Sequence, residues 1–312
     1  MTIRQATEQD RHSLVQLWQT ASYVHLHAEW QPPIDWLGNP TFVLWEEPTK
    51  RVLAWPRKAE MRLQACLAVV ADPLPAAWVR IAAAASTTAL VDTLNELFTA
   101  TWPAIEAQGI TELGWLVLEP AAPRWLPDLG FTPLVELITY VKLLRDEPTP
   151  PGNDQVQIRP VRVEEMEQLA VLDAAAYEPL WRYSAETLAL ARPQSLQFDV
   201  ALLGGKIVGS LFSMAGDQRE SAHLVRLTVS PEVQGQGVGR SLMNHFLRQC
   251  RQQGIHHISL NTQMDNRPSQ KLYHLYGFHT LPNRVAVWHK RVNTPDNATP
   301  HLSLAPELSL PL

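Results

Sequence analysis

The hydrophobic and polar positions in the second half of the chain predict a regular succession of strands and helices. Apolar runs typical of strands occupy residues 198–203, 206–212, 222–229, 258–261 and 284–292. The dipeptide Gly204-Gly205 separates the first two runs and favours a tight hairpin. Residues 241–250 instead carry apolar side chains at helical spacing, and a second short helix is predicted to end at Gly277. The pattern is that of a mixed α/β unit.

The first half of the chain repeats the beginning and the end of this pattern. A short strand-like run feeds an amphipathic segment at residues 3–17 and again at residues 158–172. Each half also closes with a Gly-Phe pair followed by a strand pattern, at Gly130-Phe131 and at Gly277-Phe278. Similar ends about half a chain apart indicate an internal duplication.

Proline-rich segments mark the predicted domain boundaries. Residues 146–155 combine prolines, a glycine and polar residues that interrupt any helical or strand period, so we interpret them as a linker. This linker divides a first domain at residues 1–145 from a second at residues 156–292. Residues 293–312 contain four prolines and no amphipathic period, which predicts a disordered tail.

Length, charge and composition narrow the class of protein. At 312 residues the chain is long enough for two cores. Residues 1–150 have a net charge of −6 and the remainder +1, without a basic block, so nucleic acid is not expected as a partner. No apolar run is long enough to span a bilayer, and the first residues lack the apolar core of a signal peptide. We expect a soluble, cytoplasmic protein without a membrane partner, and nothing indicates its oligomeric state.

Cysteine and histidine spacing does not indicate a metal site. Cys66 and Cys250 are far apart and lie in different predicted domains, so they are interpreted as buried small hydrophobes. His25 and His27 stand at alternate positions, but no acidic or cysteine partners accompany them. With Trp18, Tyr23, Trp30 and Trp36 they form an aromatic cluster that either lines a substrate pocket or packs in the core.

The strongest chemical signal is the glycine-rich run Gln234–Gly239, which joins a predicted strand to a predicted helix. Such a turn gathers backbone N–H groups and the positive end of a helix around one point, which suits a phosphate. The dinucleotide fingerprint requires a small residue where Arg240 stands, and the nucleotide-triphosphate loop requires a lysine that is absent. Both common nucleotide sites are therefore excluded.

This run is similar to the pyrophosphate loop of the GCN5-related N-acetyltransferase (GNAT) superfamily. The preceding Leu227–Pro231 resembles the strand before that loop, and Asn266–Phe278 resembles the second signature of the family. The resemblance covers roughly residues 156–292. It implies an α/β (α+β) fold class with two tandem acyl-CoA N-acyltransferase-like domains, each with a mixed, mostly antiparallel central sheet flanked by helices.

The resemblance also implies roles for particular residues, with acetyl-CoA as co-substrate and no metal. The cofactor-binding positions that it implies are Leu227, Thr228, Val229, Gln234, Gly235, Gln236, Gly237, Val238, Gly239, Arg240, Asn261, Asn266 and Ser269. The thioester carbonyl is expected beside the backbone of residues 227–229, whose N–H groups would hold the oxyanion. Tyr273 is the implied general acid, with Tyr276 as a second candidate. Glu220 and His223 are the candidate general bases, and a water chain is the alternative to either.

The first half lacks the features that hold the cofactor. Residues 83–89, where a phosphate loop is expected, contain alanine, serine and threonine but no glycine. Residues 119–131 keep the Gly-Phe ending of the second signature but lack its Asn and Tyr. We therefore predict a degenerate first half with a structural or substrate-shaping role.

The predicted function is transfer of an acetyl group from acetyl-CoA to a primary amine by direct attack in a ternary complex. The amine belongs to a small molecule or to a protein, and the sequence does not decide between them. The alternatives are a non-catalytic acyl-CoA-binding or interaction module, and a scaffold whose second half is vestigial.

Overall fold

The computed structural model describes residues 2–48, 61–216 and 220–292, and the predicted tail at residues 293–312 lies outside this range. The elements of the first half are β1 (Thr2–Gln5), α1 (Arg11–Thr20), β2 (Tyr23–Leu26), β3 (Phe42–Pro48), β4 (Met61–Ala71), β5 (Ala76–Ala84), α2 (Leu90–Ala107), β6 (Glu112–Leu116) and β7 (Thr132–Leu143). Those of the second half are β8 (Gln157–Pro160), α3 (Met166–Ala176), α4 (Ala185–Ala191), β9 (Gln197–Leu203), β10 (Lys206–Ala215), β11 (Ser221–Val229), α5 (Val238–Gln252), β12 (His257–Gln263), α6 (Arg267–Leu275) and β13 (His279–Arg291).

The elements predicted for the second half are all present. β9 and β10 pair as an antiparallel hairpin, and Gly204 and Gly205 at its turn both have positive φ, at 58° and 78°. Two consecutive residues with positive φ require glycine or a similarly tolerant residue, because most side chains are strained in this backbone conformation. α5 buries its predicted apolar face on the sheet, with Leu242 and Phe246 fully enclosed.

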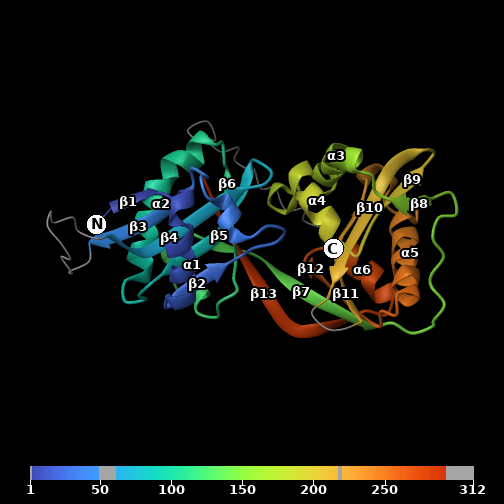
Figure 1. Ribbon diagram of the computed structural model, residues 1–312. Coiled ribbons are helices and arrows are strands. Elements are labelled where there is room, and N and C mark those ends of the chain that lie inside the picture. Colours follow the sequence, from blue (N-terminus) through green and yellow to red (C-terminus); the bar gives the residue numbers. More distant parts are fainter. Residues whose placement is uncertain (1, 49–60, 217–219, 293–312) are drawn as a thin grey trace, which may run out of the picture.

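The thirteen strands of the described residues form one sheet. Along the sheet the order is β1-β3-β4-β5-β6-β13-β7-β12-β11-β10-β9-β8, and β2 pairs with β5 off this path. Two neighbouring pairs, β5 with β6 and β11 with β12, are parallel, and the other pairs are antiparallel. The expected fold class, a mixed and mostly antiparallel sheet flanked by helices, is confirmed (Figure 1).

The two halves exchange their last strands. β7 of the first half pairs with β12 of the second, and β13 of the second half pairs with β6 of the first. β7 and β13 then pair with each other at the centre, where Figure 1 shows them running between the two lobes. The predicted linker separates the halves along the chain, but the sheet joins them. β6 in the first half and β12 in the second therefore each have one neighbouring strand that comes from the other half.

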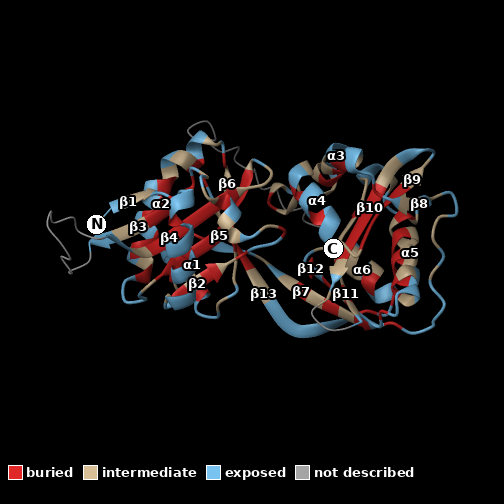
Figure 2. Ribbon diagram, in the orientation of Figure 1, coloured by how far each residue is buried: buried red, intermediate tan, exposed pale blue. Residues whose placement is uncertain are grey.

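Helices cover both faces of each lobe. In the first half α1 packs with Leu14 on one face, and α2 packs with Leu94 and Leu97 on the other. In the second half α5 and α6 share one core and α3 and α4 share another. The buried residues follow these layers in both lobes (Figure 2). Cys66 and Cys250 are buried and unpaired, as interpreted from the sequence, and burial raises the pKa of both thiols to about 12.

An ion pair at the same place in each half supports the duplication. Arg4 on β1 contacts Asp10 at 2.6 Å, and Arg159 on β8 contacts Glu165 at 2.5 Å. In both cases the acid stands six residues after the arginine and just before the first helix. Both pairs tie the entry of the helix to the strand that precedes it.

Candidate active site

A β-bulge in β11 opens the sheet where the site forms. Leu224 pairs with Ser213 on β10 and Arg226 pairs with Phe212, which leaves Val225 as the extra residue. The pairing of β11 with β12 ends at the same place, at Leu224. A bulge bends its strand and re-aims the following side chains. Beyond it, β11 and β12 no longer pair, which leaves a gap beside residues 227–229.

The backbone of β11 beyond the bulge presents alternate residues to this gap. The Leu227 carbonyl accepts a hydrogen bond from the Tyr177 hydroxyl at 2.9 Å, so Leu227 faces away from β10. The Ser230 N–H donates to the Val208 carbonyl at 2.8 Å, so Ser230 faces the β10 side. Because neighbouring strand residues direct their amides to opposite edges, the Leu227 N–H faces the gap and the Thr228 N–H faces β10. The Thr228 amide and its buried side chain therefore do not face the gap, whereas the backbone of Leu227 does.

A groove of about 350 Å³ runs from the gap to the glycine loop. The residues that line it are Ala176, Tyr177, Leu227, Val229, Val233, Gln234, Gly235, Val238, Gly239, Asn266, Pro268, Ser269 and Leu272. A Cβ added at Gly239 would make only ordinary van der Waals contacts, at 3.7 Å from Val229 and 3.8 Å from Leu227 and Leu272. Eight of the predicted cofactor-binding residues thus line one continuous surface.

The loop has the conformation that its glycines allow. Gly235 and Gly237 have φ values of 78° and 86°, in the left-handed region that favours glycine. Gly237 is the N-cap of α5, whose first turn contains no acidic residue. The positive end of the helix therefore faces the loop without a competing carboxylate, as an anion site requires. Gln236 and Arg240 flank this turn.

The second signature borders the same groove. Asn266 caps α6 by accepting a hydrogen bond from the Ser269 N–H at 3.2 Å. Both residues line the groove and also a second cavity. One turn further along α6, Tyr273 lines the second cavity, and its ring contacts Tyr140 of β7 at a centroid distance of 5.6 Å. A residue of the first half thus packs on the predicted general acid.

Burial determines the protonation of the two signature tyrosines. Burial, with a smaller contribution from Tyr177, raises the pKa of Tyr273 above its usual value of 10, although a hydrogen bond with Ser269 lowers it. Tyr276 donates its hydroxyl to the Arg240 carbonyl at 3.0 Å and to Asn244 Oδ1 at 2.7 Å, and burial raises its pKa to about 12. The Tyr276 hydroxyl is directed at α5, whereas Tyr273 lines the cavity.

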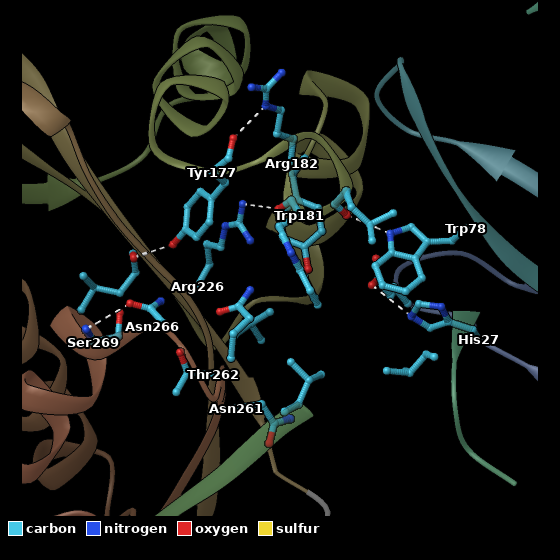
Figure 3. Close-up of a pocket in the computed structure, with 18 of the residues that line it drawn as sticks. His27, Trp78, Tyr177, Trp181, Arg182, Arg226, Asn261, Thr262, Asn266 and Ser269 are labelled. Atoms are coloured by element: carbon cyan, nitrogen blue, oxygen red, sulfur yellow. Dashed lines mark hydrogen bonds and ion pairs between the residues drawn. The ribbon is translucent and has the colours of Figure 1, made fainter. Parts of the chain in front are cut away.

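The second cavity, of about 230 Å³, lies between the two halves (Figure 3). The first half contributes His27, Glu29, Asp72, Trp78, Arg80, Leu116 and Leu137, and the second half contributes Tyr177, Leu180, Trp181, Arg182, Tyr183, His223, Val225, Arg226, Leu227, Asn261, Thr262, Gln263, Asn266, Ser269 and Tyr273. Four of these residues, Tyr177, Leu227, Asn266 and Ser269, also line the groove. The groove and the inter-half cavity therefore meet beside Leu227.

Arg226 organises the wall that the second half contributes. Its guanidinium contacts the Asp173 carboxylate at 2.5 and 2.9 Å and donates to the Trp181 carbonyl at 2.6 Å. It also lies 3.5 Å from the ring centroid of Tyr177 and 4.5 Å from that of Tyr183. Sequence reasoning missed this cluster. The sequence feature that could have indicated the cluster is Arg226, a charged residue inside the apolar run 222–229.

A polar cluster forms part of the wall that the first half contributes. Arg80 contacts Glu29 at 3.5 Å and His27 Nε2 at 3.3 Å. Burial lowers the pKa of His27, so the imidazole is neutral at pH 7. Burial alone would raise the pKa of Glu29, but Arg80 and His27 lower it to about 2. Beside this cluster Trp78 packs edge-on against Trp181 of the second half at 5.6 Å.

The structure separates the two candidate bases. Glu220 lies seven residues before Leu227, about 23 Å away along an extended strand, and its carbonyl accepts from the His256 N–H. Glu220 is therefore not brought to the site. His223 lines the inter-half cavity, with Nδ1 2.9 Å from Ser259 Oγ. Asn261 also lines this cavity rather than the groove, and its Oδ1 accepts from Thr139 at 2.9 Å.

In the first half, a strand of the chain itself occupies the corresponding gap. β5 pairs with β6 only up to Trp78, and β2 then pairs along the freed edge, from Leu26 opposite Ile81 to Tyr23 opposite Ala84. The edge that stays open in β11 is therefore covered in β5. With this edge covered and no glycine in residues 83–89, the first half has no equivalent of the open edge of β11 at this place.

The predicted aromatic cluster of the first half is divided between core and cavities. His25 is fully buried and contacts the Val79 carbonyl at 3.1 Å and Glu119 at 3.2 Å. Trp30 and Trp36 line a smaller cavity of about 170 Å³, while His27 lines the larger one. Among the described residues no three His, Cys, Asp or Glu side chains gather as metal ligands, and none of the described helices is long and apolar enough to cross a membrane.

Comparisons with known proteins agree with this geometry. Residues 163–278 match the acetyltransferase (GNAT) family. A Bacillus subtilis (strain 168) protein provisionally named ribosomal protein bS18-alanine N-acetyltransferase is 21% identical over 120 residues, which are 38% of this chain and 78% of that protein.

Two solved structures are similar over nearly the whole chain. A GCN5-related N-acetyltransferase from Sphaerobacter thermophilus has a TM-score of 0.53 at 15% identity, over 93% of this chain and 95% of the other. A tandem GNAT protein from the clavulanic acid biosynthesis pathway has a TM-score of 0.53 at 13% identity, over 95% and 99% of the two chains. At these identities the likeness concerns the fold, and it extends through both halves. The second half of the chain thus contains a GNAT acetyltransferase domain, and the fold of the whole chain is that of tandem GNAT structures.

Proposed function

We propose that this chain is an acetyl-CoA-dependent N-acetyltransferase whose acceptor is a primary amine of a small molecule bound between the two halves. The observation that carries the proposal is the meeting of two cavities beside Leu227. One cavity runs to a glycine loop suited to a pyrophosphate, and the other is lined by both halves. Donor and acceptor can therefore approach one point from two directions, as direct attack in a ternary complex requires.

The donor site follows from the groove. The glycine loop and the N-terminus of α5 would hold the pyrophosphate, and the pantetheine arm would follow the open edge of β11. The N–H of Leu227 would then face the thioester carbonyl and stabilise its oxyanion, because that N–H faces the gap. Thr228 contributes no donor there, since its amide faces β10.

The chemistry requires one bond to form and one to break. The neutral amine attacks the thioester carbon, and collapse of the tetrahedral intermediate breaks the C–S bond. The amine proton leaves to solvent, directly or through water near His223, and Tyr273 donates a proton to the thiolate. Burial makes the phenol a weaker acid, but the same dry surroundings also disfavour the thiolate and make it a stronger base.

Size and enclosure favour a small acceptor over a protein. The inter-half cavity of about 230 Å³ is lined on one side by Trp78, Leu116 and Leu137 of the first half. A polypeptide terminus would have to thread between two halves that share one sheet. The bS18-alanine acetyltransferase relative, named for a protein substrate, matches only 38% of this chain. The first half supplies the additional wall.

Replacing Tyr273 by Phe tests the proposed general acid. Thiol release from acetyl-CoA would first be screened against small amines, amino acids, polyamines, aminoglycosides and N-terminal peptides. With the best acceptor we expect Tyr273→Phe to lower kcat about 100-fold, a typical contribution of general acid catalysis, while the Kd for acetyl-CoA changes less than about twofold.

Tyr276→Phe is the matched control, because it also removes a buried tyrosine hydroxyl but one directed at α5. Its kcat should stay near that of the wild type. Since burial raises the pKa of Tyr273 above 10, the acid stays protonated, and its ionisation should not lower the wild-type rate between pH 7 and 10. An unchanged kcat in Tyr273→Phe would remove it from the mechanism. No thiol release with any amine would favour the binding-module alternative.

A bulky residue in the inter-half cavity tests the acceptor site. Leu137 lines the cavity from β7, and Leu137→Trp would fill much of it. We expect kcat/KM for the amine to fall at least about tenfold, with acetyl-CoA affinity unchanged, because only the acceptor space is reduced. Leu134→Trp, at an exposed position of the same strand, is the control. Equal kinetics in the two variants would place the acceptor elsewhere.

A further inference from the structure

The segment that joins the two halves lies along α5. The Arg251 guanidinium donates to the Arg145 carbonyl at 2.7 Å, and Asn244 Nδ2 donates to the Pro150 carbonyl at 2.9 Å. Gly152 sits so close to α5 that a Cβ there would lie 2.5 Å from Ser241 Oγ. The segment was predicted as a linker, and here it is fastened to the helix that begins at the glycine loop.

Asn153 is held from three directions. Its backbone N–H donates to Ser241 Oγ at 2.8 Å. Its side-chain Oδ1 accepts from the Gln155 N–H at 2.9 Å, in the manner of an Asx turn. Its Nδ2 then donates to the Gln236 carbonyl at 2.9 Å. The Asn153 amide is therefore fixed at both ends, and one end holds a carbonyl of the glycine loop.

That contact sets the direction of a loop amide. The Gln236 carbonyl and the Gly237 N–H belong to one planar trans peptide, so they point in opposite directions. While Asn153 holds the carbonyl, the Gly237 N–H is directed away from the joining segment. Rotation of this peptide would exchange the donor for a carbonyl oxygen, which repels a phosphate. Gly237 is itself packed against Asn153, because a Cβ there would lie 3.3 Å from the Asn153 nitrogen.

We infer that Asn153, in the segment between the halves, is a positioning residue that holds the Gln236-Gly237 peptide in the orientation that binds the pyrophosphate of acyl-CoA. The inference rests on the proposed function, in which the loop receives that pyrophosphate. Asn153 acts through the loop and does not itself need to touch the cofactor. The connection between the halves thereby becomes part of the donor site.

Calorimetric titration of the full chain with acetyl-CoA tests this role. Asn153→Ala removes the hydrogen bond to the Gln236 carbonyl. We therefore expect the Kd for acetyl-CoA to rise about 5- to 10-fold, as for one lost hydrogen bond. Asn153→Asp keeps the acceptor for Gln155 but sets a carboxylate oxygen against the Gln236 carbonyl, so its Kd should rise further. Gln155→Ala is the control, because its backbone N–H still donates to Asn153.

A second ligand separates positioning from general loosening. S-acetylpantetheine lacks the pyrophosphate, so its affinity should be the same in the wild type and in Asn153→Ala. Equal loss for both ligands, or unchanged acetyl-CoA affinity in both Asn153 variants, would overturn the inference. Failure of the wild type itself to bind acetyl-CoA would instead overturn the proposed function. Thermal unfolding without ligand verifies that each variant is folded.

Discussion

Residues 146–292 expressed alone are expected neither to unfold cooperatively nor to bind acetyl-CoA, although they contain the glycine loop and both signatures. The physical reason is the exchange of strands. β13 has both of its neighbours, β6 and β7, in the first half, and β12 has β7 on one side. Loss of β6 and β7 as neighbouring strands is expected to cost more than the free energy of unfolding of a typical domain, which is about 5–15 kcal/mol. Circular dichroism during heating and acetyl-CoA titration measure the two outcomes.

Fragment complementation is the control for this truncation. Co-expression of residues 1–145 supplies β6 and β7 in trans, and acetyl-CoA binding should return in the complex. A fragment of residues 146–292 that melts cooperatively and binds acetyl-CoA like the intact chain would contradict the dependence of the second half on the first. In that case the first half would serve only to shape the acceptor cavity.

Gly237→Ala is expected to weaken acetyl-CoA binding at least about tenfold. An alanine with φ near 86° costs about 1–2 kcal/mol, and its Cβ would press on the Asn153 nitrogen at 3.3 Å. Relief of that strain moves the loop amides that face the phosphate. Isothermal calorimetry gives the Kd, and unfolding gives the stability.

Gly205→Ala provides the matched control for the strain itself. Gly205 also has positive φ, at 78°, but nothing lies within 4 Å of its Cβ position, and it is not among the residues that line the groove. We expect a similar loss of stability and an unchanged Kd. Equal affinities in Gly237→Ala and Gly205→Ala would show that the loop does not hold the cofactor.

Local pattern was sufficient to predict much of the second half. Gly204-Gly205 predicted a hairpin and the apolar face of α5 predicted its packing, because both signals lie within a few residues. The spacing of the glycines from Gln234 to Gly239 likewise predicted a turn that joins a strand to a helix. Fold class followed from the resemblance that these motifs carry, and the structure comparisons extend it over both halves.

The pairing of distant strands was not predictable in the same way. Nothing in the strand pattern of residues 132–143 shows that it lies beside β12 rather than beside β6, because strands pair through backbone N–H and C=O groups that every strand carries. The inter-half cavity could not be predicted for the same reason, because its walls come from residues far apart in the sequence, such as Trp78 and Trp181, which are in contact between the halves. Which of residues 227–229 face the gap depends on the bulge at Val225, and one sequence does not reveal a bulge.

Titration of the intact chain with acetyl-CoA tests most directly whether one of the two related folds retains the donor site. We expect one molecule bound per chain, through the loop of the second half, and a clear loss of affinity in Gly237→Ala. Binding of two molecules per chain would contradict the closure of the first-half gap by β2. Absence of binding, or binding that Gly237→Ala leaves unchanged, would contradict the assignment of the groove.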